Sequence, residues 1–368
     1  MRDKFIGKLR CFQASLMVFF ILFSGIFGTG INLILKIAEE DCWISAFVTI
    51  FLGFIPFYIF LKISTSYPNK NIFEIIDYIC GKNLGKIINF IIILFSSSFL
   101  LLNFWSLTNL ISSQFLYKTP QIFVYIIFMI PIIYMLSKKL NVILQSATLI
   151  FFITILLYFI TSISLLPQVN ISNILPILKN GIAPVIEASF GLTIYCILPL
   201  FFISSIPVYY YEDKQNYTKY MIISYFISCL LIFIIPFFIV SVFGIELSQL
   251  YQYPEFQILR RISIGGFIER IESTLSVQWI FSLFILIIIG LYFIKTGFYH
   301  IFKIKNNFIK ITVNFIFLIM IIILGLNTFN NNTIANQFSI KQYPFVCYIF
   351  LIFIGFLATI IFIKRKRA

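Results

Sequence analysis

Ten apolar segments, each close to or above the length that crosses a bilayer, occupy most of this 368-residue chain. A helix satisfies all of its backbone hydrogen bonds within lipid, so segments of this length predict transmembrane helices. Only 11% of the residues are charged, against about 25% in soluble domains. The chain is therefore predicted to be an all-α integral membrane protein. The segments are 12–35, 43–62, 86–110, 121–137, 143–165, 182–209, 217–243, 273–299, 308–328 and 343–363.

The distribution of Lys and Arg predicts the topology of these spans. With a cytoplasmic N-terminus and ten crossings, 20 of the 27 basic residues fall on the cytoplasmic side, as the positive-inside rule requires. Both termini are then cytoplasmic. The net charge of +14 thus indicates anionic lipid of the bilayer as the partner, and not nucleic acid. The seven basic residues left on the outer side are Lys36, Lys118, Lys179, Arg260, Arg261, Arg270 and Lys341.

The first and sixth spans both carry helix-breaking residues. The first contains three glycines within Ser24–Gly30, and the sixth contains Ser189–Gly191 between Pro184 and Pro199. Paired breaks of this kind are typical of inverted-repeat transporters, whose solute site lies at the two interrupted helices. Gly and Pro are also common in membrane helices in general, so either break alone carries little weight.

The layout divides into two halves of five spans, and an odd number of spans inverts the second half. Repeat one covers about 12–165 and repeat two about 182–363. The longest outer connection is 244–272, and no soluble or low-complexity segment interrupts the chain. We interpret 1–368 as a single polytopic membrane domain.

The broken first span predicts a site for an amino acid. The N–H groups and positive dipole end of a half-helix suit a carboxylate, and exposed carbonyls before the break suit an ammonium group. Asn103 in span three and Ser282 in span eight add polar atoms, although interhelical packing explains such residues equally well. The expected ligand-binding residues are Gly25, Gly28, Thr29 and Gly30 on one wall, Ser189, Phe190, Gly191 and Thr193 opposite, and Asn103 and Ser282.

Several charged residues near the outer side could couple binding to other events. Glu187 lies about two turns inside span six, where acids are costly; an aqueous vestibule is the alternative explanation. Glu272, Ser276, Trp279 and Ser282 are spaced four, three and three residues apart, so they share one helix face. That face could line the cavity, or Glu272 could simply begin a solvated helix, where the dipole favours an acid.

Enzymatic chemistry has little support in the sequence. His300 is the only histidine, and it falls at the cytoplasmic end of span eight. The six cysteines are scattered singly without a C-x-x-C spacing, which argues against a zinc site or a disulfide framework. A phosphate-binding loop of the form G-x-x-x-x-G-K-[ST] is missing from the sequence. We therefore expect no metal and no cofactor.

The outer loop carries the most specific pattern in the chain. It reads Tyr253-Pro254, Arg261, Ile262-Ser263-Ile264-Gly265, Phe267, Glu269-Arg270-Ile271-Glu272 and then Trp279. In this pattern the chain resembles the spore germination permease family, the B subunit of germinant receptors. Gly28-Thr29-Gly30, Ser189-Phe190-Gly191, the ten-span layout and the length also fit. One departure is Leu192, where many relatives carry an acid.

The resemblance implies a fold like that of the amino acid–polyamine–organocation transporters, with helices 1 and 6 broken. It also implies residence in the inner membrane of the bacterial spore, beside a larger membrane A subunit and a lipoprotein C subunit. Such a protein senses a small nutrient, such as an amino acid, and signals germination to its partners. The residues expected to shape the loop or couple binding to the partners are Glu187, Arg260, Arg261, Glu269, Arg270, Glu272 and Trp279.

Two other functions fit the same sequence. The first is a true secondary transporter that couples an amino acid to a proton or cation; Glu187 is the only deeply placed acid available for coupling. The second is a structural membrane scaffold with a vestigial site. Solute flux separates transport from sensing, and a scaffold predicts neither flux nor binding.

Overall fold

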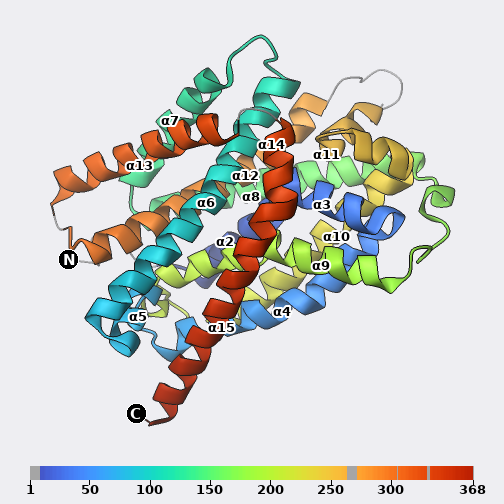
Figure 1. Ribbon diagram of the computed structural model, residues 1–368. Coiled ribbons are helices and arrows are strands. Elements are labelled where there is room, and N and C mark those ends of the chain that lie inside the picture. Colours follow the sequence, from blue (N-terminus) through green and yellow to red (C-terminus); the bar gives the residue numbers. More distant parts are fainter. Residues whose placement is uncertain (1–8, 263–271, 305, 330–331, 368) are drawn as a thin grey trace.

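The computed structural model describes residues 9–262, 272–304, 306–329 and 332–367 (Figure 1). These residues form helices and their connections, and a lone bridge joins Leu9 to Tyr211. Among them, eight helical stretches are long and apolar enough to cross a membrane. Two shorter apolar helices, Cys11–Gly25 and Gln121–Ser137, accompany these eight. The prediction of an all-helical integral membrane protein is confirmed.

Every segment predicted to cross the membrane contains helix. The first predicted span comprises two helices, and the sixth is an α-helix continued by a 3₁₀-helix. The elements are α2 (Cys11–Gly25), α3 (Thr29–Ala38), η1 (Glu39–Asp41), α4 (Cys42–Ser66), α5 (Ile72–Cys80), α6 (Lys82–Gln114), α7 (Gln121–Ser137), α8 (Leu140–Leu165), η2 (Leu166–Gln168), η3 (Ile171–Ile174), α9 (Ile182–Cys196), η4 (Leu198–Ser205), η5 (Val208–Tyr210), α10 (Tyr217–Leu250), α11 (Pro254–Gln257), η6 (Ile258–Arg261), α12 (Glu272–Ile301), α13 (Asn307–Thr328), α14 (Asn332–Gln337), η7 (Phe338–Gln342) and α15 (Tyr343–Arg367).

Helix α2 runs through the centre of the bundle. Fourteen of its fifteen residues are buried, and it packs against α8, α10 and α12. A helix that is apolar on all sides is expected at such a position, because it has no face directed to water. The break that follows α2 is therefore enclosed by other helices.

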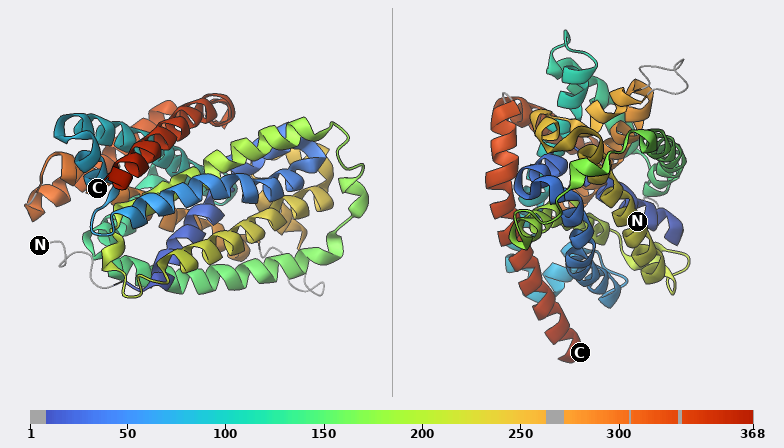
Figure 2. Two further views of the ribbon diagram at one scale, coloured as in Figure 1. Left: turned by 90° about the horizontal axis from the view of Figure 1, so that it is seen from below. Right: turned by 90° about the vertical axis from the view of Figure 1, so that its right-hand side faces the viewer.

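The connections between helices gather at two ends of the bundle. At one end, the N–H of Leu9 donates to the carbonyl of Tyr210 at 3.1 Å. At the other, Nε2 of Gln168 donates to the carbonyl of Arg261 at 2.5 Å. Figure 2 shows α2 beginning and α15 ending toward one end, with the 166–181 connection at the opposite end. The described connections named here therefore lie at opposite ends of the bundle.

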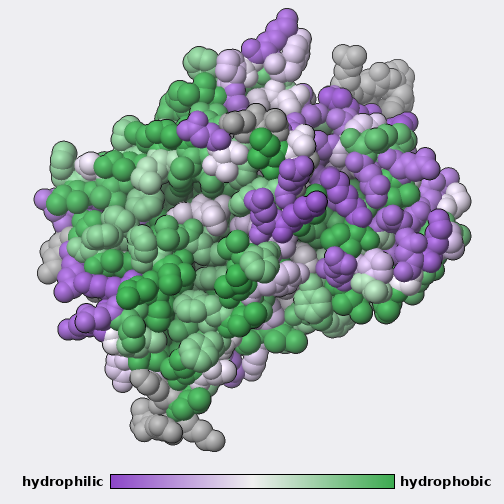
Figure 3. All heavy atoms as spheres, viewed as in Figure 1, coloured by the Kyte–Doolittle hydropathy of each residue, from purple (hydrophilic) through white to green (hydrophobic). Residues whose placement is uncertain are grey.

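The flanks of the bundle are apolar. Large side chains such as Phe51 (60% exposed) and Ile352 (71% exposed) lie on the outside of their helices. In Figure 3, hydrophobic residues cover the middle of the visible face, and hydrophilic residues gather over the end that carries α3 and α11. An apolar surface of this extent marks contact with a membrane, so lipid is the solvent of these flanks.

Candidate functional site

The first span is broken between α2 and α3. Gly28 has φ +67° and ψ −95°, a left-handed backbone that glycine adopts without a steric penalty. The N–H of Phe27 donates to the carbonyl of Ser24 at 3.4 Å, and that of Ile31 to the carbonyl of Ile26 at 2.8 Å. The interruption that the glycines of span one predicted is confirmed.

The break in the sixth span lies later than the sequence suggested. Helix α9 continues through Ser189–Gly191 to Cys196, and the chain changes to the 3₁₀-helix η4 at Leu198. Pro199 explains the change, since it has no N–H to donate to the carbonyl of Tyr195. Of the breaking features expected in this span, Pro199 therefore marks the change, whereas the interruption expected at Ser189–Gly191 was wrong because these residues stay helical.

The two breaks touch through their backbones. A Cβ atom added to Gly25 would lie 2.6 Å from the carbonyl oxygen of Tyr195 and 2.9 Å from Cα of Cys196. Both neighbours are main-chain atoms, so no side-chain rotation could make room. Glycine is required at position 25 because α2 ends directly against the end of α9.

An acid that sequence reasoning did not single out covers the break. Oε1 of Glu255, in α11, accepts a hydrogen bond from the backbone N–H of Gly28 at 2.7 Å. The Glu255 side chain is only 2% exposed. The neighbouring Asn32 donates from Nδ2 to the carbonyl of Gln252 at 2.7 Å. A carboxylate of the protein itself thus lies where the sequence predicted the carboxylate of a ligand.

Burial dominates the electrostatics of Glu255. Removal from water raises the pKa of this carboxyl group to about 7 from an ordinary value of 4.5, and the hydrogen bond from Gly28 opposes the rise. Near neutral pH the group therefore exists in both protonation states. Such a carboxyl group beside a helix break is a candidate for function on physical grounds.

Further hydrogen bonds hold the stretch that contains Glu255 in place; residues 252–257 are called the outer segment below. Asn109 of α6 donates from Nδ2 to the hydroxyl of Tyr253 at 2.7 Å and to Oδ1 of Asn332 at 3.0 Å. Asn332 in turn donates to Oε1 of Gln252 at 2.5 Å. The segment that carries Glu255 is thereby joined to α6 and α14. Asn109 was missed in the sequence because one Asn within an apolar span is explained equally by helix packing.

The residues predicted for the α9 wall have internal partners. The hydroxyl of Ser189 donates to the carbonyls of Val185 (2.7 Å) and Ser45 (3.0 Å), and that of Thr193 donates to the carbonyl of Ser189 (2.9 Å). Gly191 lies against Leu33 of α3. Phe190 is 46% exposed, so its ring is not buried against the break.

The predicted face of α12 does meet the break. Trp279 and Phe27 pack with ring centroids 4.9 Å apart, and Ser276 and Ser282 are fully buried on the same helix. The hydroxyl of Ser282 donates to the carbonyl of Gln278 at 2.6 Å. This face therefore contacts the break through an aromatic ring, while Ser282 is bonded within its own helix. Asn103 is likewise bonded within its helix, since Nδ2 donates to the carbonyl of Phe99 at 2.9 Å.

The predicted coupling residues lie at different depths. Glu187 is exposed, on the same side of α9 as Phe190, and Glu272 begins α12. The guanidinium groups of Arg260 and Arg261 lie over the rings of Phe256 (5.1 Å) and Phe243 (5.5 Å). Glu269 and Arg270 lie outside the described residues.

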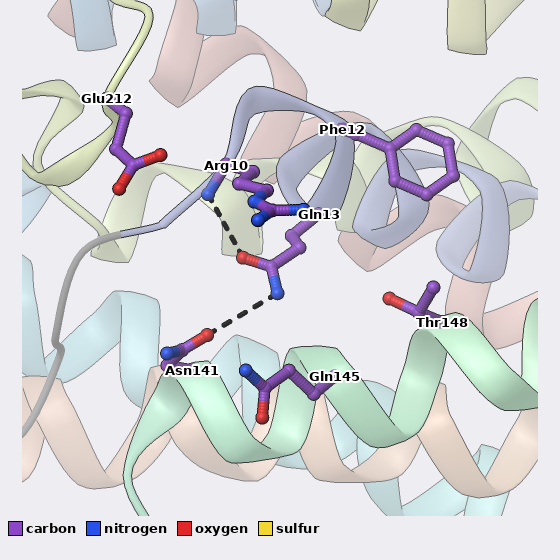
Figure 4. Close-up of a pocket in the computed structure, with 7 residues that line it drawn as sticks. All are labelled: Arg10, Phe12, Gln13, Asn141, Gln145, Thr148 and Glu212. Atoms are coloured by element: carbon purple, nitrogen blue, oxygen red, sulfur yellow. Dashed lines mark hydrogen bonds between the residues drawn. The ribbon is translucent and has the colours of Figure 1, made fainter.

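A cavity lies at the other end of α2, away from the break at Gly28. Its volume is about 500 Å³, and it opens between the start of α2 and α8 (Figure 4). Within it, Gln13 accepts from the N–H of Arg10 (3.0 Å) and donates to Asn141 (3.4 Å). The cavity is separated from the break by the length of α2, so it is not part of the site at Gly28. Its lining residues are Arg10, Phe12, Gln13, Asn141, Gln145, Thr148 and Glu212.

Comparison with known families identifies the chain. A family model described as "Spore germination protein" matches residues 12–334. The chain belongs to the spore germination protein family. The resemblance indicated by the outer loop motif is therefore confirmed over residues 12–334. This spore germination protein is 26% identical to spore germination protein KB of Bacillus subtilis (strain 168), over 76% of this chain and 77% of that protein.

Two further relatives come from the same organism. YndE is 26% identical over 81% of this chain and 82% of its own length, and spore germination protein A2 is 23% identical over 79% and 80%. Among solved structures, the Eremococcus coleocola manganese transporter superposes with a TM-score of 0.60 over 93% of this chain and 75% of that one, at 12% identity. The family member thus has a transporter-type fold.

Proposed function

We propose that this family member is the nutrient-sensing B subunit of a germinant receptor in the inner membrane of the spore. It binds a small nutrient at the break between α2 and α3. We propose an amino acid, because its carboxylate suits the N–H groups at the start of α3. In this proposal the chain crosses the membrane ten times with both termini in the cytoplasm. The repeats 12–165 and 182–363 are inverted with respect to each other. Family membership and the two sets of loops at opposite ends support this arrangement.

The hydrogen bond between Gly28 and Glu255 carries the proposal. The carboxylate of Glu255 accepts from the N–H at the start of α3, the kind of position that binds anions in other proteins. An incoming amino acid presents the same functional group. Its carboxylate would therefore compete with Glu255 for the N–H of Gly28, and each nutrient bound would release Glu255 from the break.

Release of Glu255 provides the signal. Gln252, Tyr253 and Glu255 hold the outer segment to α3, α6 and α14, so their release frees this segment. Arg260 and Arg261 lie on the continuation of the segment, and Glu272 begins α12 beyond it. A ligand that binds the released state better shifts the population toward it. The membrane A subunit and the lipoprotein C subunit are the proposed readers of this shift.

A secondary amino-acid transporter coupled to a proton or cation is the second candidate. The fold shared with the manganese transporter favours it. Uptake of labelled amino acid into proteoliposomes distinguishes the two functions. Binding without flux supports the sensor, and concentrative uptake would replace the sensor with the transporter.

The proposal is tested by a ligand screen with two matched glycine variants. A nutrient that binds the purified, full-length protein raises its melting temperature by mass action. At a nutrient concentration of 100 times Kd, the free energy of unfolding rises by about 2.7 kcal/mol. Gly28→Val and Gly81→Val both place a branched residue at a positive φ, +67° and +81°. A Cβ at position 28 lies 3.6 Å from the ring of Tyr253, whereas a Cβ at position 81 has no atom within 4 Å. We expect Gly28→Val to lose the ligand shift and Gly81→Val to keep it. An unchanged shift in Gly28→Val would remove the site from this break.

A further inference from the structure

Two buried oxygen atoms near the break have no hydrogen-bond donor. They are Oε2 of Glu255 and Oε1 of Gln278, and neither has a partner among the described residues. The side chains are 2% and 1% exposed. Both line one small cavity of about 30 Å³ between α8, α10, the outer segment and α12. Because buried polar atoms are nearly always paired, two unpaired acceptors in one cavity require an explanation.

Three of the donors that line this cavity, on Tyr158, Thr161 and Gln278, are directed to other protein atoms. The hydroxyl of Tyr158 donates to the carbonyl of Leu231, and that of Thr161 to the carbonyl of Leu157, each at 2.8 Å. The amide nitrogen of Gln278 donates to the hydroxyl of Thr161 at 3.2 Å. These three donors therefore leave Oε2 of Glu255 and Oε1 of Gln278 unsatisfied, and an entering group with its own donors or positive charge would satisfy both oxygens.

The described residues also provide no ionic partner for the carboxyl group of Glu255. Within the described parts of the chain no Lys or Arg side chain forms an ion pair with it. The nearest arginines in sequence, Arg260 and Arg261, lie over aromatic rings. A buried carboxylate without a counter-charge is costly, and a cation in the adjoining cavity removes that cost.

We infer that this cavity binds one monovalent cation, either an alkali ion or an ammonium group, between Glu255 and Gln278. Its volume of about 30 Å³ exceeds the roughly 10–15 Å³ that a single water molecule needs, so a small ion fits and a whole amino acid does not. Trp279 forms part of the wall, and an indole ring attracts cations. One carboxylate matches one positive charge.

The cation and the helix break share the same carboxylate. The N–H of Gly28 holds Oε1 of Glu255, and the cation holds Oε2, so the bound ion stabilises the outer segment on the break. Protons compete with the ion for Glu255. Among the residues that the structure describes, the hydroxyls of Tyr158 and Tyr253 are the other titratable groups near this carboxyl. Cation affinity is therefore expected to fall as the pH is lowered through 7.

Fluorescence of Trp279 tests the inference without any nutrient. The chain has three tryptophans, so Trp43→Phe with Trp105→Phe leaves Trp279 as the single reporter in the full-length protein. The protein is titrated at pH 8 with KCl, NaCl, NH₄Cl and methylammonium chloride, against choline chloride at equal ionic strength. We expect a saturable change in emission and a rise in melting temperature with at least one small cation and not with choline. The alkali and ammonium titrations distinguish the two kinds of cation.

Two variants assign the response to the cavity. Glu255→Gln removes the charge and supplies an amide donor, so the cation response should vanish; Glu246→Gln, at an exposed acid of the same outer region, should keep it. If Glu255→Gln does not fold, Gln278→Met decides, with an expected tenfold loss of affinity. A wild-type response no different from choline would mean that the cavity holds water only. A cation affinity in Gln278→Met or Glu255→Gln equal to that of the wild type would place the cation elsewhere. Either of these two results overturns the inference. Neither bears on nutrient binding, which the glycine variants test separately.

Discussion

The carboxylate of Glu255 accepts a 2.7 Å hydrogen bond from the backbone N–H of Gly28, a residue 227 positions earlier in the chain. This contact joins the outer loop to the one break in the central helix. Because the carboxylate is buried, the energy of the contact depends on its protonation state. The outer loop is thereby linked to both pH and the occupancy of the break.

The pH dependence of stability follows from the raised pKa of Glu255. Between about pH 4.5 and 7 the folded protein binds a proton that the unfolded chain has lost, so stability falls as the pH rises through this range. The full effect is about 3 kcal/mol at one pKa unit per 1.36 kcal/mol. Melting temperatures in buffers from pH 4.5 to 8, without added nutrient, measure it. Glu255→Gln should flatten the curve, and Glu246→Gln should leave it unchanged; equal slopes in all three proteins would contradict the assignment.

The contact between the two helix breaks predicts a strict requirement for glycine at position 25. Gly25→Ala forces a methyl group to 2.6 Å from the carbonyl oxygen of Tyr195, and the helices must separate. Overpacking of this kind costs about 1–3 kcal/mol. Gly355→Ala is the matched control, since its Cβ meets no atom within 4 Å and alanine favours the helix. Thermal melts of both purified variants should show a loss for Gly25→Ala only. Equal melting temperatures would mean that the breaks do not touch.

The Tyr253 hydroxyl tests whether the outer segment acts as a latch, that is, whether its hydrogen bonds hold it to the helix bundle until nutrient binds. Tyr253→Phe removes the acceptor for Asn109, which keeps its bond to Asn332, at a cost of about 1 kcal/mol. A weaker latch makes the released state more populated. Spores with this variant should therefore respond to about fivefold less nutrient, the factor that corresponds to 1 kcal/mol. Tyr251→Phe, whose ring contact with Phe243 is retained, should respond as the wild type does. A higher nutrient requirement in Tyr253→Phe would show that the segment is needed for binding.

The helices and the first break were predictable because local composition determines them. Apolar runs of about 20 residues are helical in lipid, and Gly28 supplies the left-handed backbone that interrupts the first helix. In the sixth span, Gly191 resembles a helix breaker but serves close packing against Leu33, so the interruption expected there was wrong. The change to a 3₁₀-helix falls at Leu198-Pro199, where proline removes a backbone donor.

Burial of Glu255 had no local signal. Glutamate in a charged loop is normally exposed, and only the return of the loop over α3 buries it. Sequence spacing did place Trp279 on the face that meets the break, because helical periodicity depends on the helix alone. Which hydroxyls bond within their own helices, as Ser189 and Ser282 do, depends on neighbouring packing and was not predictable.

The cluster of polar side chains around Asp77 predicts how α5 is held. Oδ2 of Asp77 lies 2.7 Å from Nε2 of His300, and Oδ1 accepts from Nδ2 of Asn89 at 3.0 Å, so one carboxylate joins α5, α6 and α12. The pair is about a quarter exposed, and partly exposed ion pairs contribute about 1 kcal/mol or less. Asp77→Ala should therefore loosen α5 with little effect on the global melt. Limited proteolysis of residues 67–81, which connect α4 to α6 and contain α5, measures this, with Asn83→Ala, at an exposed site, as the control. Cleavage at the wild-type rate in Asp77→Ala would show that apolar contacts such as Phe73 with Phe293 (4.9 Å) are sufficient to hold the helix.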